Sequence, residues 1–210
     1  MPLLKLGNLY NLDCMEGMKQ FPDKYFELAI VDPPYGIERF KNPKGRFEKY
    51  GDTRKGNNEV PDQKYFNELY RISRNQIIWG GNYFGLDMSK GAVIWDKGLY
   101  GKTNYADGEM AYTSFKNPLR IAQIRYDGFL GADKDGRINP FQKPIKLYDW
   151  LLKKYAKQGD KILDTHVGSA SSLIACYNLD YEYIGFELDA DFFNLATERL
   201  EAVKSQMRLF

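Results

Sequence analysis

The sequence is poor in the residues that carry much of enzyme chemistry. It holds one histidine, His166, and two cysteines, Cys14 and Cys176, that lie far apart. A histidine-rich metal site is therefore excluded, and a Ser-His-Asp triad would depend on His166 alone. Two distant cysteines argue against a disulfide framework or a zinc cluster and favour a reducing compartment. We expect a cytoplasmic protein whose chemistry needs neither a metal nor a second imidazole.

Strong charge and long apolar runs are also lacking. The net charge is +2, so any basic surface for a nucleic acid must be local. No apolar run approaches the length of a membrane span, and the first residues lack the apolar region of a signal peptide. A chain of 210 residues that is 43% hydrophobic suits one domain with one substantial core. Aromatic content is high, with 16 tyrosines, which suits stacking on flat ligands and interfaces alike.

Short apolar runs alternate with helical patterns along the chain. The runs predict strands at 26–31, 76–79, 92–95, 161–164 and 183–187. Helical spacing is found at 63–73, 145–156, 169–178 and 190–207, and Asp13 can cap a short helix over 14–20. Residues 109–115 and 119–126 read as two more strands, which we expect to form a hairpin across residues 116–118. This alternation predicts an α/β fold, a mostly parallel, doubly wound, Rossmann-like sheet with helices on both faces.

The apolar run at 26–31 ends in Asp-Pro-Pro-Tyr. Pro33 and Pro34 stop the strand because neither has a backbone N–H, and Asp32 is held extended because it precedes a proline. A carboxylate and the ring of Tyr35 are thus fixed at the carboxyl end of a buried strand, where open α/β sheets bind ligands. The alternative is an ordinary turn at the end of a strand.

Residues 162–187 form a second unit of strand, small-residue turn, helix and strand. The first strand ends at Asp164, the turn contains Gly168, and the second strand ends at Glu187. This is the layout of a nucleoside-binding unit, in which the second acid binds ribose hydroxyls. Only one glycine of the dinucleotide fingerprint is present, which disfavours a nicotinamide dehydrogenase and favours S-adenosylmethionine, a nucleoside without a pyrophosphate. Accidents of packing are the alternative.

Two polar, glycine-rich segments fit neither a helix nor a strand. Residues 36–62 interleave cations with aromatic residues, which suggests contacts to phosphates and stacking on bases. A solvated flexible loop is the alternative there. Residues 98–140 hold two further polar glycine-rich stretches around the predicted strands.

These stretches resemble, in order, the amino-methylating DNA methyltransferases in their circularly permuted arrangement, with the catalytic motif ahead of the cofactor motif. The resemblance rests on residues 32–35, 139–144, 164–169 and 183–187, with support from 95–97 and 109–114. It spans nearly the whole chain. It implies one S-adenosylmethionine-dependent methyltransferase domain over 1–210 with a Rossmann-like sheet, a flexible DNA-binding loop at 36–62 and a small target-recognition insertion at about 98–140. It also implies a prokaryotic or phage origin.

The resemblance assigns roles to individual residues. It implies that Asp32 and the Pro33 carbonyl accept hydrogen bonds from the target amino group, beside Pro34, and that Tyr35 stacks on the extruded base. It places the ribose hydroxyls on Glu187. The cofactor-binding residues that it implies are Asp13, Asp32, Lys143, Asp164, Thr165, His166, Gly168, Ser169, Ala170 and Glu187. The DNA-binding candidates within the two polar segments are Arg39, Lys41, Lys44, Arg46, Lys102 and Asn104.

The chain also departs from the family pattern. His166 stands where the family usually has phenylalanine or a small residue, and Ala170 and Ser171 replace a more usual Gly-Thr pair. These changes bear on the shape of the cofactor pocket. We expect His166 to pack against or bond the periphery of the cofactor rather than act as a base.

The predicted activity is methyl transfer from S-adenosylmethionine, without a metal, to the N6 amino group of a flipped-out adenine in double-stranded DNA. Within the resemblance, an aspartate at position 32 goes mostly with adenine, which is a tendency only. Transfer to cytosine N4, methylation of an RNA or protein amide, and a non-catalytic cofactor-binding module remain alternatives. The short segment between the two motifs suggests a short recognition sequence and, as a hypothesis, a homodimer that holds the duplex.

Overall fold

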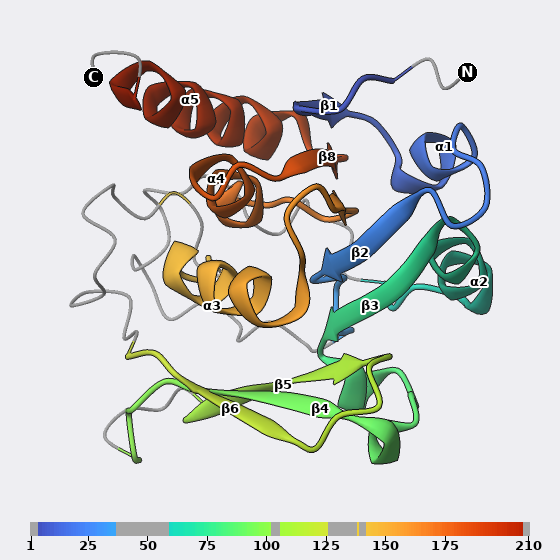
Figure 1. The fold of residues 1–210 in the computed structure, drawn as a ribbon, viewed down its shortest axis with the longest axis vertical. Helices are drawn as coiled ribbons and strands as arrows, with labels where there is room; N and C mark the ends of the chain where they lie inside the picture. The colour runs from blue at the N-terminus through green and yellow to red at the C-terminus, as the bar shows by residue number, and fades with distance from the viewer. Residues whose placement is uncertain (1–3, 37–58, 102–105, 126–137, 139–141, 208–210) are drawn as a thin grey trace.

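The fold is organised on one eight-stranded sheet (Figure 1). The computed structural model describes residues 4–36, 59–101, 106–125, 138 and 142–207. The strands run in the order β1-β8-β7-β2-β3-β5-β4-β6, and β5 alone is antiparallel to its neighbours. Their bounds are β1 Asn8–Asn11, β2 Phe26–Val31, β3 Ser73–Trp79, β4 Ala92–Asp96, β5 Gly108–Thr113, β6 Arg120–Gln123, β7 Lys161–Asp164 and β8 Glu182–Glu187.

Helices cover both faces of this sheet (Figure 1). The inner strand β2 is apolar on both sides, because Leu28 and Ile30 belong to one buried cluster and Ala29 and Val31 to the other. The first cluster packs under α3 (Ile145–Tyr155), α4 (Ser171–Asn178) and α5 (Ala190–Met207). The second packs under α1 (Cys14–Met18) and α2 (Gln63–Ile72). The predicted doubly wound α/β sheet is therefore confirmed.

The helix starts follow local chemistry. Asp13 caps α1 by accepting hydrogen bonds from the backbone N–H of Met15 and Glu16, and Asp62 caps α2 through the N–H of Tyr65 at 3.1 Å. Two short 3₁₀ helices, η3 (Gly81–Tyr83) and η4 (Met88–Lys90), link β3 to β4. No helix in the described ranges is long and apolar enough to cross a membrane.

The predicted hairpin between 109–115 and 119–126 is wrong. β4 lies between β5 and β6, and Ile94 pairs with Met110 on one side and with Ile121 on the other. The connection after β5 passes close to Gly91, just before β4, where a side chain would collide with the backbone of Phe115. The chain thus crosses the N-terminal end of β4 to reach the free edge of that strand, where β6 pairs with β4 in the parallel direction.

Candidate active site

Two acids that end neighbouring parallel strands lie at the centre of the sheet. Asp32 directly follows β2 and Asp164 ends β7, and these two strands pair in the middle of the strand order. After β2 the chain continues to β3 on one side, whereas after β7 it continues to β8 on the other. This reversal is a topological switch point, where the carboxyl ends of the strands leave a crevice for a ligand.

The side chain of Asp32 has a hydrogen-bond donor on each carboxylate oxygen. The Tyr35 hydroxyl donates to Oδ1 at 2.5 Å, and the Lys143 ammonium donates to Oδ2 at 2.5 Å. Burial, with the nearby Asp32 and Glu109 charges, raises the pKa of Tyr35 well above its usual value, so the phenol keeps the proton that it donates. The aspartate is thus held in one orientation at the end of β2.

The ring of Tyr35 is fixed by its neighbours as well as by its hydroxyl. It stacks on Tyr83, with centroids 5.1 Å apart and planes 15° apart, and meets the edge of Phe84 at 6.0 Å. Gly80, with φ +70°, lies directly behind it, and a side chain at Gly80 would collide with the ring. Tyr83 itself is half exposed. The aromatic face at the strand end therefore consists of two tyrosines rather than one.

Alternating charges continue from Asp32 toward β4. The Lys143 ammonium also lies 3.1 Å from Glu109, and the other oxygen of Glu109 lies 2.7 Å from the Lys97 ammonium. The Lys143 side chain is only 5% exposed, so this is a largely buried arrangement. We refer to Lys97, Glu109, Lys143 and Asp32 as the charge chain.

The reversed strand β5 explains how Glu109 reaches this edge. Parallel strands present their carboxyl ends here, whereas an antiparallel strand presents its beginning. Glu109 is the second residue of β5 and pairs with Trp95 of β4, while Lys97 directly follows that strand. Lys97 also lies 4.9 Å from the centre of the Trp95 ring, a cation–π distance.

Both inner members of the charge chain keep their charges. Burial alone would lower the pKa of Lys143, but Asp32 and Glu109 raise it above its usual value. Burial alone would raise the pKa of Glu109, but Lys143 and Lys97 lower it to about 2. Lys143 and Glu109 are therefore both ionised across the physiological pH range.

Asp164 and Glu187 form a second acidic group at the ends of β7 and β8. Asp164 accepts hydrogen bonds from the Ser172 hydroxyl and, at 2.9 Å, from the His166 N–H. Glu187 accepts at 2.8 Å from the N–H of Gly168, which has φ +56°, and so ties the turn to the strand end. None of the described cations forms an ion pair with either acid. The described residues contain no cluster of three metal-ligating side chains.

Burial weakens the ionisation of both acids. It raises the pKa of Asp164 to about 7, against the opposing hydrogen bonds from Ser172 and His166. It also raises the pKa of Glu187, again against backbone hydrogen bonds. Such a pair attracts a ligand that brings positive charge and hydrogen-bond donors.

His166 is a packed, neutral side chain. Its Nδ1 lies 2.9 Å from the Thr165 hydroxyl, which lies 2.7 Å from the buried Tyr65 hydroxyl, and its ring meets the Tyr65 ring edge-on. Burial lowers the pKa of His166 to about 4, so the ring is uncharged at neutral pH. This geometry suits a packing role and not that of a cation.

The turn that precedes α4 is anchored from α5. The buried Arg199 donates to the Ser169 carbonyl at 2.7 Å and to the Ser171 hydroxyl at 2.9 Å. Ala170 has φ +61°, and its methyl group is fully buried in the core. Ala170 as a whole is 0% exposed and presents no surface to a ligand, whereas Ser169 is 6% exposed. The predicted cofactor contact of Ala170 stays a prediction.

The remaining predicted residues are divided between the described and the undescribed parts of the chain. Asp13 is exposed at the start of α1, beyond the end of β1, and Pro33 and Pro34 follow Asp32 as expected. Lys143 contacts Asp32, and its predicted contact with the cofactor stays a prediction. The DNA-binding candidates all lie outside the described residues, namely Arg39, Lys41, Lys44, Arg46, Lys102 and Asn104.

Sequence reasoning gave no role to Lys97, Glu109, Tyr83 or Arg199. The stretches that contain Lys97 and Glu109 contributed to the resemblance, but nothing in their local pattern predicts an ion pair. The pairing of Asp96 with Gly108 brings them together. Tyr83 follows a glycine turn at the end of β3, which was the available signal for a residue at this edge.

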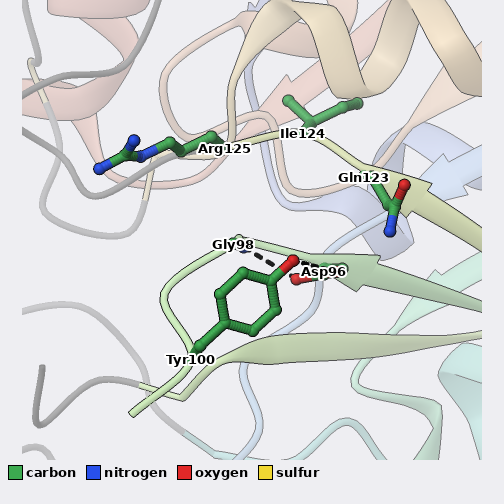
Figure 2. A pocket seen from close by; sticks show the side chains of 6 residues that line it. All are labelled: Asp96, Gly98, Tyr100, Gln123, Ile124 and Arg125. Carbon is green, nitrogen blue, oxygen red and sulfur yellow. Dashed lines mark hydrogen bonds between the residues drawn. The ribbon is translucent and has the colours of Figure 1, made fainter. Parts of the chain in front are cut away.

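A polar surface hollow lies further along the same edge, at the ends of β4 and β6. Figure 2 shows the Tyr100 hydroxyl against Asp96, to which it donates at 3.5 Å, with the Gly98 N–H donating to Asp96 at 2.8 Å. Gln123 and Arg125 line its other side. The hollow thus offers an exposed ring, an amide and a guanidinium within the predicted insertion at 98–140.

Comparisons with known proteins agree with this geometry. The type II methyltransferase M.HpaI from Haemophilus parainfluenzae is 31% identical over 90% of this chain and 73% of its own length. PvuII DNA methyltransferase (cytosine-N4-specific) superposes with a TM-score of 0.60 over 96% of this chain and 91% of its own, at 12% identity. The M1.HpyAVI–SAM complex does so with a TM-score of 0.59 over 92% and 98%, at 17% identity. A family model described as DNA methylase matches residues 94–198, half of the chain. Given that match and the M.HpaI relationship, the chain belongs to the N6/N4 DNA methylase family and is a DNA methyltransferase.

Proposed function

We propose that this methyltransferase transfers a methyl group from S-adenosylmethionine to the N6 amino group of adenine in double-stranded DNA. The observation that carries the proposal is the position of Asp32 and Tyr35 at the end of β2, beside Asp164 at the end of the neighbouring β7. A hydrogen-bond acceptor for an amine and an acidic pocket for a cationic ligand thus meet at one crevice.

The residues of the acidic group fit S-adenosylmethionine. That cofactor carries an ammonium group, a sulfonium centre and two ribose hydroxyls. Asp164 would take the ammonium, and Glu187, with one backbone donor on each oxygen, has lone pairs left for the hydroxyls. Gly168, in the turn between the two acids, has no side chain that could obstruct the ligand. Thr165, His166 and Asp13 surround this pocket in the proposal.

The residues of the catalytic motif supply hydrogen-bond acceptors for the target amino group. The amino group of adenine is weakly nucleophilic because its lone pair is delocalised into the ring. Asp32 and the Pro33 carbonyl would hold the two amino hydrogens and favour a pyramidal nitrogen as it attacks. The bound cofactor would supply an electrophilic methyl group on a good leaving group, so positioning provides much of the remaining effect. The thioether leaves uncharged, and the methylated nitrogen, now cationic, loses one of its hydrogens as a proton, which Asp32 would accept and pass to solvent. His166 takes no part as a base.

The target base must leave the duplex to reach this crevice. Tyr35, held against Tyr83, offers it a stacking surface. We assign contact with the duplex to residues 36–62 and 98–140, most of the first range and parts of the second lying outside the described residues. Tyr100, Gln123 and Arg125 at the surface hollow are candidate contacts. Exposed aromatic and basic residues together suit bases and phosphates.

The methylated product tests the proposal directly. Incubation of the protein with labelled S-adenosylmethionine and unmethylated duplex DNA, followed by digestion to nucleosides, should place the label in N6-methyladenine. The aspartate at position 32 is the reason to expect adenine. RNA and bulk protein in parallel reactions should stay unlabelled.

Other positions of the label would select another function. Label in N4-methylcytosine would keep the mechanism and change the base. Label in RNA or protein would move the substrate outside DNA. Cofactor binding measured by calorimetry, together with an unlabelled digest for every substrate, would point to a binding module.

Gly80→Ala should disturb the position of Tyr35, and so lower catalysis, without weakening cofactor binding. In Gly80→Ala the new side chain collides with the Tyr35 ring, so ring and hydroxyl must move away from Tyr83 and Asp32. We expect kcat/KM for DNA to fall by about tenfold to a hundredfold, the cost of misplacing a group near the reacting atoms. The Kd for S-adenosylmethionine should remain within about threefold of wild type.

Gly85→Ala is the matched control for this variant. Gly85 has φ +64°, close to the +70° of Gly80, but a side chain there meets nothing within 4 Å. Both variants therefore carry a similar backbone penalty of about 1–2 kcal/mol, which thermal unfolding will show. Gly85→Ala should retain wild-type methylation, and an equal loss of activity in both variants would contradict the role given to the Tyr35 ring.

A further inference from the structure

Three side chains form a hydrogen-bond relay behind the turn that follows β7. The Tyr65 hydroxyl lies 2.7 Å from the Thr165 hydroxyl, which lies 2.9 Å from Nδ1 of His166. Tyr65 is 4% exposed and Thr165 2%, so their hydroxyl hydrogens depend on acceptors within the protein. Within the described residues, neither hydroxyl has a hydrogen-bond partner outside the relay. The hydrogens of the relay must therefore be shared among these three groups.

Only one arrangement gives every hydroxyl hydrogen of the relay an acceptor. Burial raises the pKa of Tyr65, so its phenol keeps a hydrogen, and the Thr165 oxygen is the acceptor within reach. The Thr165 hydrogen must then point to Nδ1 of His166, which has to accept it. A hydrogen on Nδ1 would instead leave one hydroxyl hydrogen buried without an acceptor, which disfavours that arrangement by about tenfold.

The relay thus determines which nitrogen of His166 carries a hydrogen. The ring is neutral at neutral pH, because burial lowers its pKa to about 4, and so it has a single N–H. With Nδ1 as an acceptor, that hydrogen is on Nε2. Nε2 has no hydrogen-bond partner in the part of the chain that the structure describes, and it is not one of the enclosed, unpartnered atoms there. The partly exposed ring therefore presents a donor in the turn between Asp164 and Gly168.

A donor at this point complements the acidic group. When ionised, Asp164 and Glu187 offer only acceptors, which suit the ammonium and hydroxyl groups of S-adenosylmethionine. The same cofactor carries acceptors of its own, namely a carboxylate and the ring nitrogens of adenine. These acceptors need donors, and a neutral imidazole supplies one without adding charge to the pocket.

We propose that His166 donates a hydrogen bond from Nε2 to an acceptor of S-adenosylmethionine, either its carboxylate or an adenine nitrogen. Thr165, itself oriented by Tyr65, is a positioning residue that holds the imidazole in the required tautomer. This inference rests on the location of the cofactor in the proposed function. The contact differs from that of a base, since His166 keeps its hydrogen throughout.

The tautomer can be observed directly because His166 is the only histidine of the chain. In protein labelled with nitrogen-15, the long-range proton–nitrogen spectrum of the imidazole distinguishes the nitrogen that carries a hydrogen from the one that does not. In the free protein we expect one tautomer, with the hydrogen on Nε2, well above the pKa of about 4. Saturating S-adenosylmethionine should shift the Nε2 signal and slow exchange of its hydrogen with solvent.

Binding measurements test the contact independently of the spectrum. His166→Phe keeps a ring beside Tyr65 but has no donor, so we expect the Kd for S-adenosylmethionine to rise about fivefold to tenfold. His166→Gln should bind more tightly than His166→Phe, because its amide can donate. The probe 5′-methylthioadenosine lacks the carboxylate. An effect of His166→Phe that persists with this probe places the acceptor on adenine, and an effect that disappears places it on the carboxylate.

Thr165→Val and Thr165→Ser are the matched pair for the positioning role. Valine keeps the shape of threonine without the hydroxyl, so the Nδ1 signal should move and the Kd should rise about fivefold. Serine restores the hydroxyl and should return both the signal and the Kd toward wild type. A defect of packing alone would not follow the hydroxyl in this way.

Three results would overturn the inference: a hydrogen on Nδ1, an Nε2 signal that saturating cofactor leaves unchanged, or a His166→Phe variant with wild-type affinity. A wild type that binds S-adenosylmethionine but labels no adenine contradicts the proposed function and leaves the tautomer and the contact standing. Circular dichroism melts identify any variant that fails to fold. In that case the spectra of the wild-type protein, free and bound, decide.

Discussion

Asp32→Ala should lower the rate of methyl transfer by about a thousandfold while S-adenosylmethionine still binds within a fewfold of its wild-type Kd. The reason is that the carboxylate acts on the amino group as the new bond forms, and loss of one preorganised group of this kind costs about 10²–10³ in kcat. Loss of the charge adds to that cost. Single-turnover transfer with bound DNA measures the effect on the chemical step, and calorimetry measures cofactor binding.

The surroundings of Asp32 make this variant interpretable. Its removal does not strand a buried cation, because Lys143 keeps Glu109 as a partner at 3.1 Å. Asp32→Asn is the matched variant, since it retains the shape and one oxygen acceptor but no charge. It should fall between wild type and alanine. Turnover in Asp32→Ala above about a tenth of the wild-type rate would remove Asp32 from the catalytic role.

The affinity for S-adenosylmethionine should rise about a hundredfold between pH 5 and pH 7 and level off above it. In the free protein Asp164 has a pKa of about 7, so below that pH most of it is protonated. An ammonium requires the ionised form, and each pH unit below the pKa then weakens binding about tenfold. Calorimetry in buffers of different ionisation enthalpy should also show a proton released on binding near pH 6.

Asp164→Asn and Glu187→Gln separate the two acids. The asparagine variant keeps one acceptor oxygen, for the backbone N–H of His166, and offers an NH2 group to the Ser172 hydroxyl, which can accept from it. It cannot ionise, so we expect weak, pH-independent binding, about a hundredfold below wild type at pH 8. Glu187→Gln should also bind the cofactor more weakly, because the proposed acceptor of the ribose hydroxyls loses its charge. Its affinity should still rise between pH 5 and pH 7, because Asp164 is unchanged. A step that survives in Asp164→Asn would assign the titration to another group.

Asp164→Asn should weaken cofactor binding but raise the stability of the folded protein at neutral pH. The pKa of Asp164 is higher in the folded chain than its ordinary 3.8, so its contribution is full below about pH 4 and is lost as pH rises to about 7. Three units correspond to about 4 kcal/mol at most, for a side chain that is 2% exposed. Above pH 7 Asp164→Asn should therefore unfold at a higher denaturant concentration than wild type. The ionised carboxylate that the cofactor needs thus lowers the stability of the folded protein. The lowered pKa of His166 reduces the free energy of unfolding as pH falls below about 6.5. His166 is present in both wild type and Asp164→Asn, so its effect drops out of the difference between them.

Local sequence predicted much of this architecture because strand ends carry their own signals. Pro33 and Pro34 stop β2 whatever its neighbours are, and Asp164 and Glu187 each end an apolar run before a turn. Parallel strands that alternate with helices must then present these ends at a common edge. The order of strands and helices therefore predicted that the acidic group and Asp32 lie at one edge of the sheet, but not that β2 and β7 are adjacent.

The charge chain was not predictable in the same way. Lys97 and Glu109 meet because β4 and β5 pair in one particular register, and Lys143 reaches them from a distant segment. The mistaken hairpin has the same origin, since a short link made β5 and β6 look like partners when β4 lies between them. Pairing between strands is a property of the whole sheet, and local periodicity carries little of it.

The single reversed strand also bears on how such an enzyme can diversify. Lys97 and Glu109 are both set by backbone ladders, and the Lys97 N–H closes the base of the connection between them by donating to the Asp107 carbonyl at 2.9 Å. Between Lys97 and Asp107, the residues that the structure describes, 98–101 and 106, lie outside the sheet. If this connection contributes to the recognition of DNA, as proposed for 98–140, substitutions in it can change the recognised sequence while Lys97 and Glu109 keep their positions.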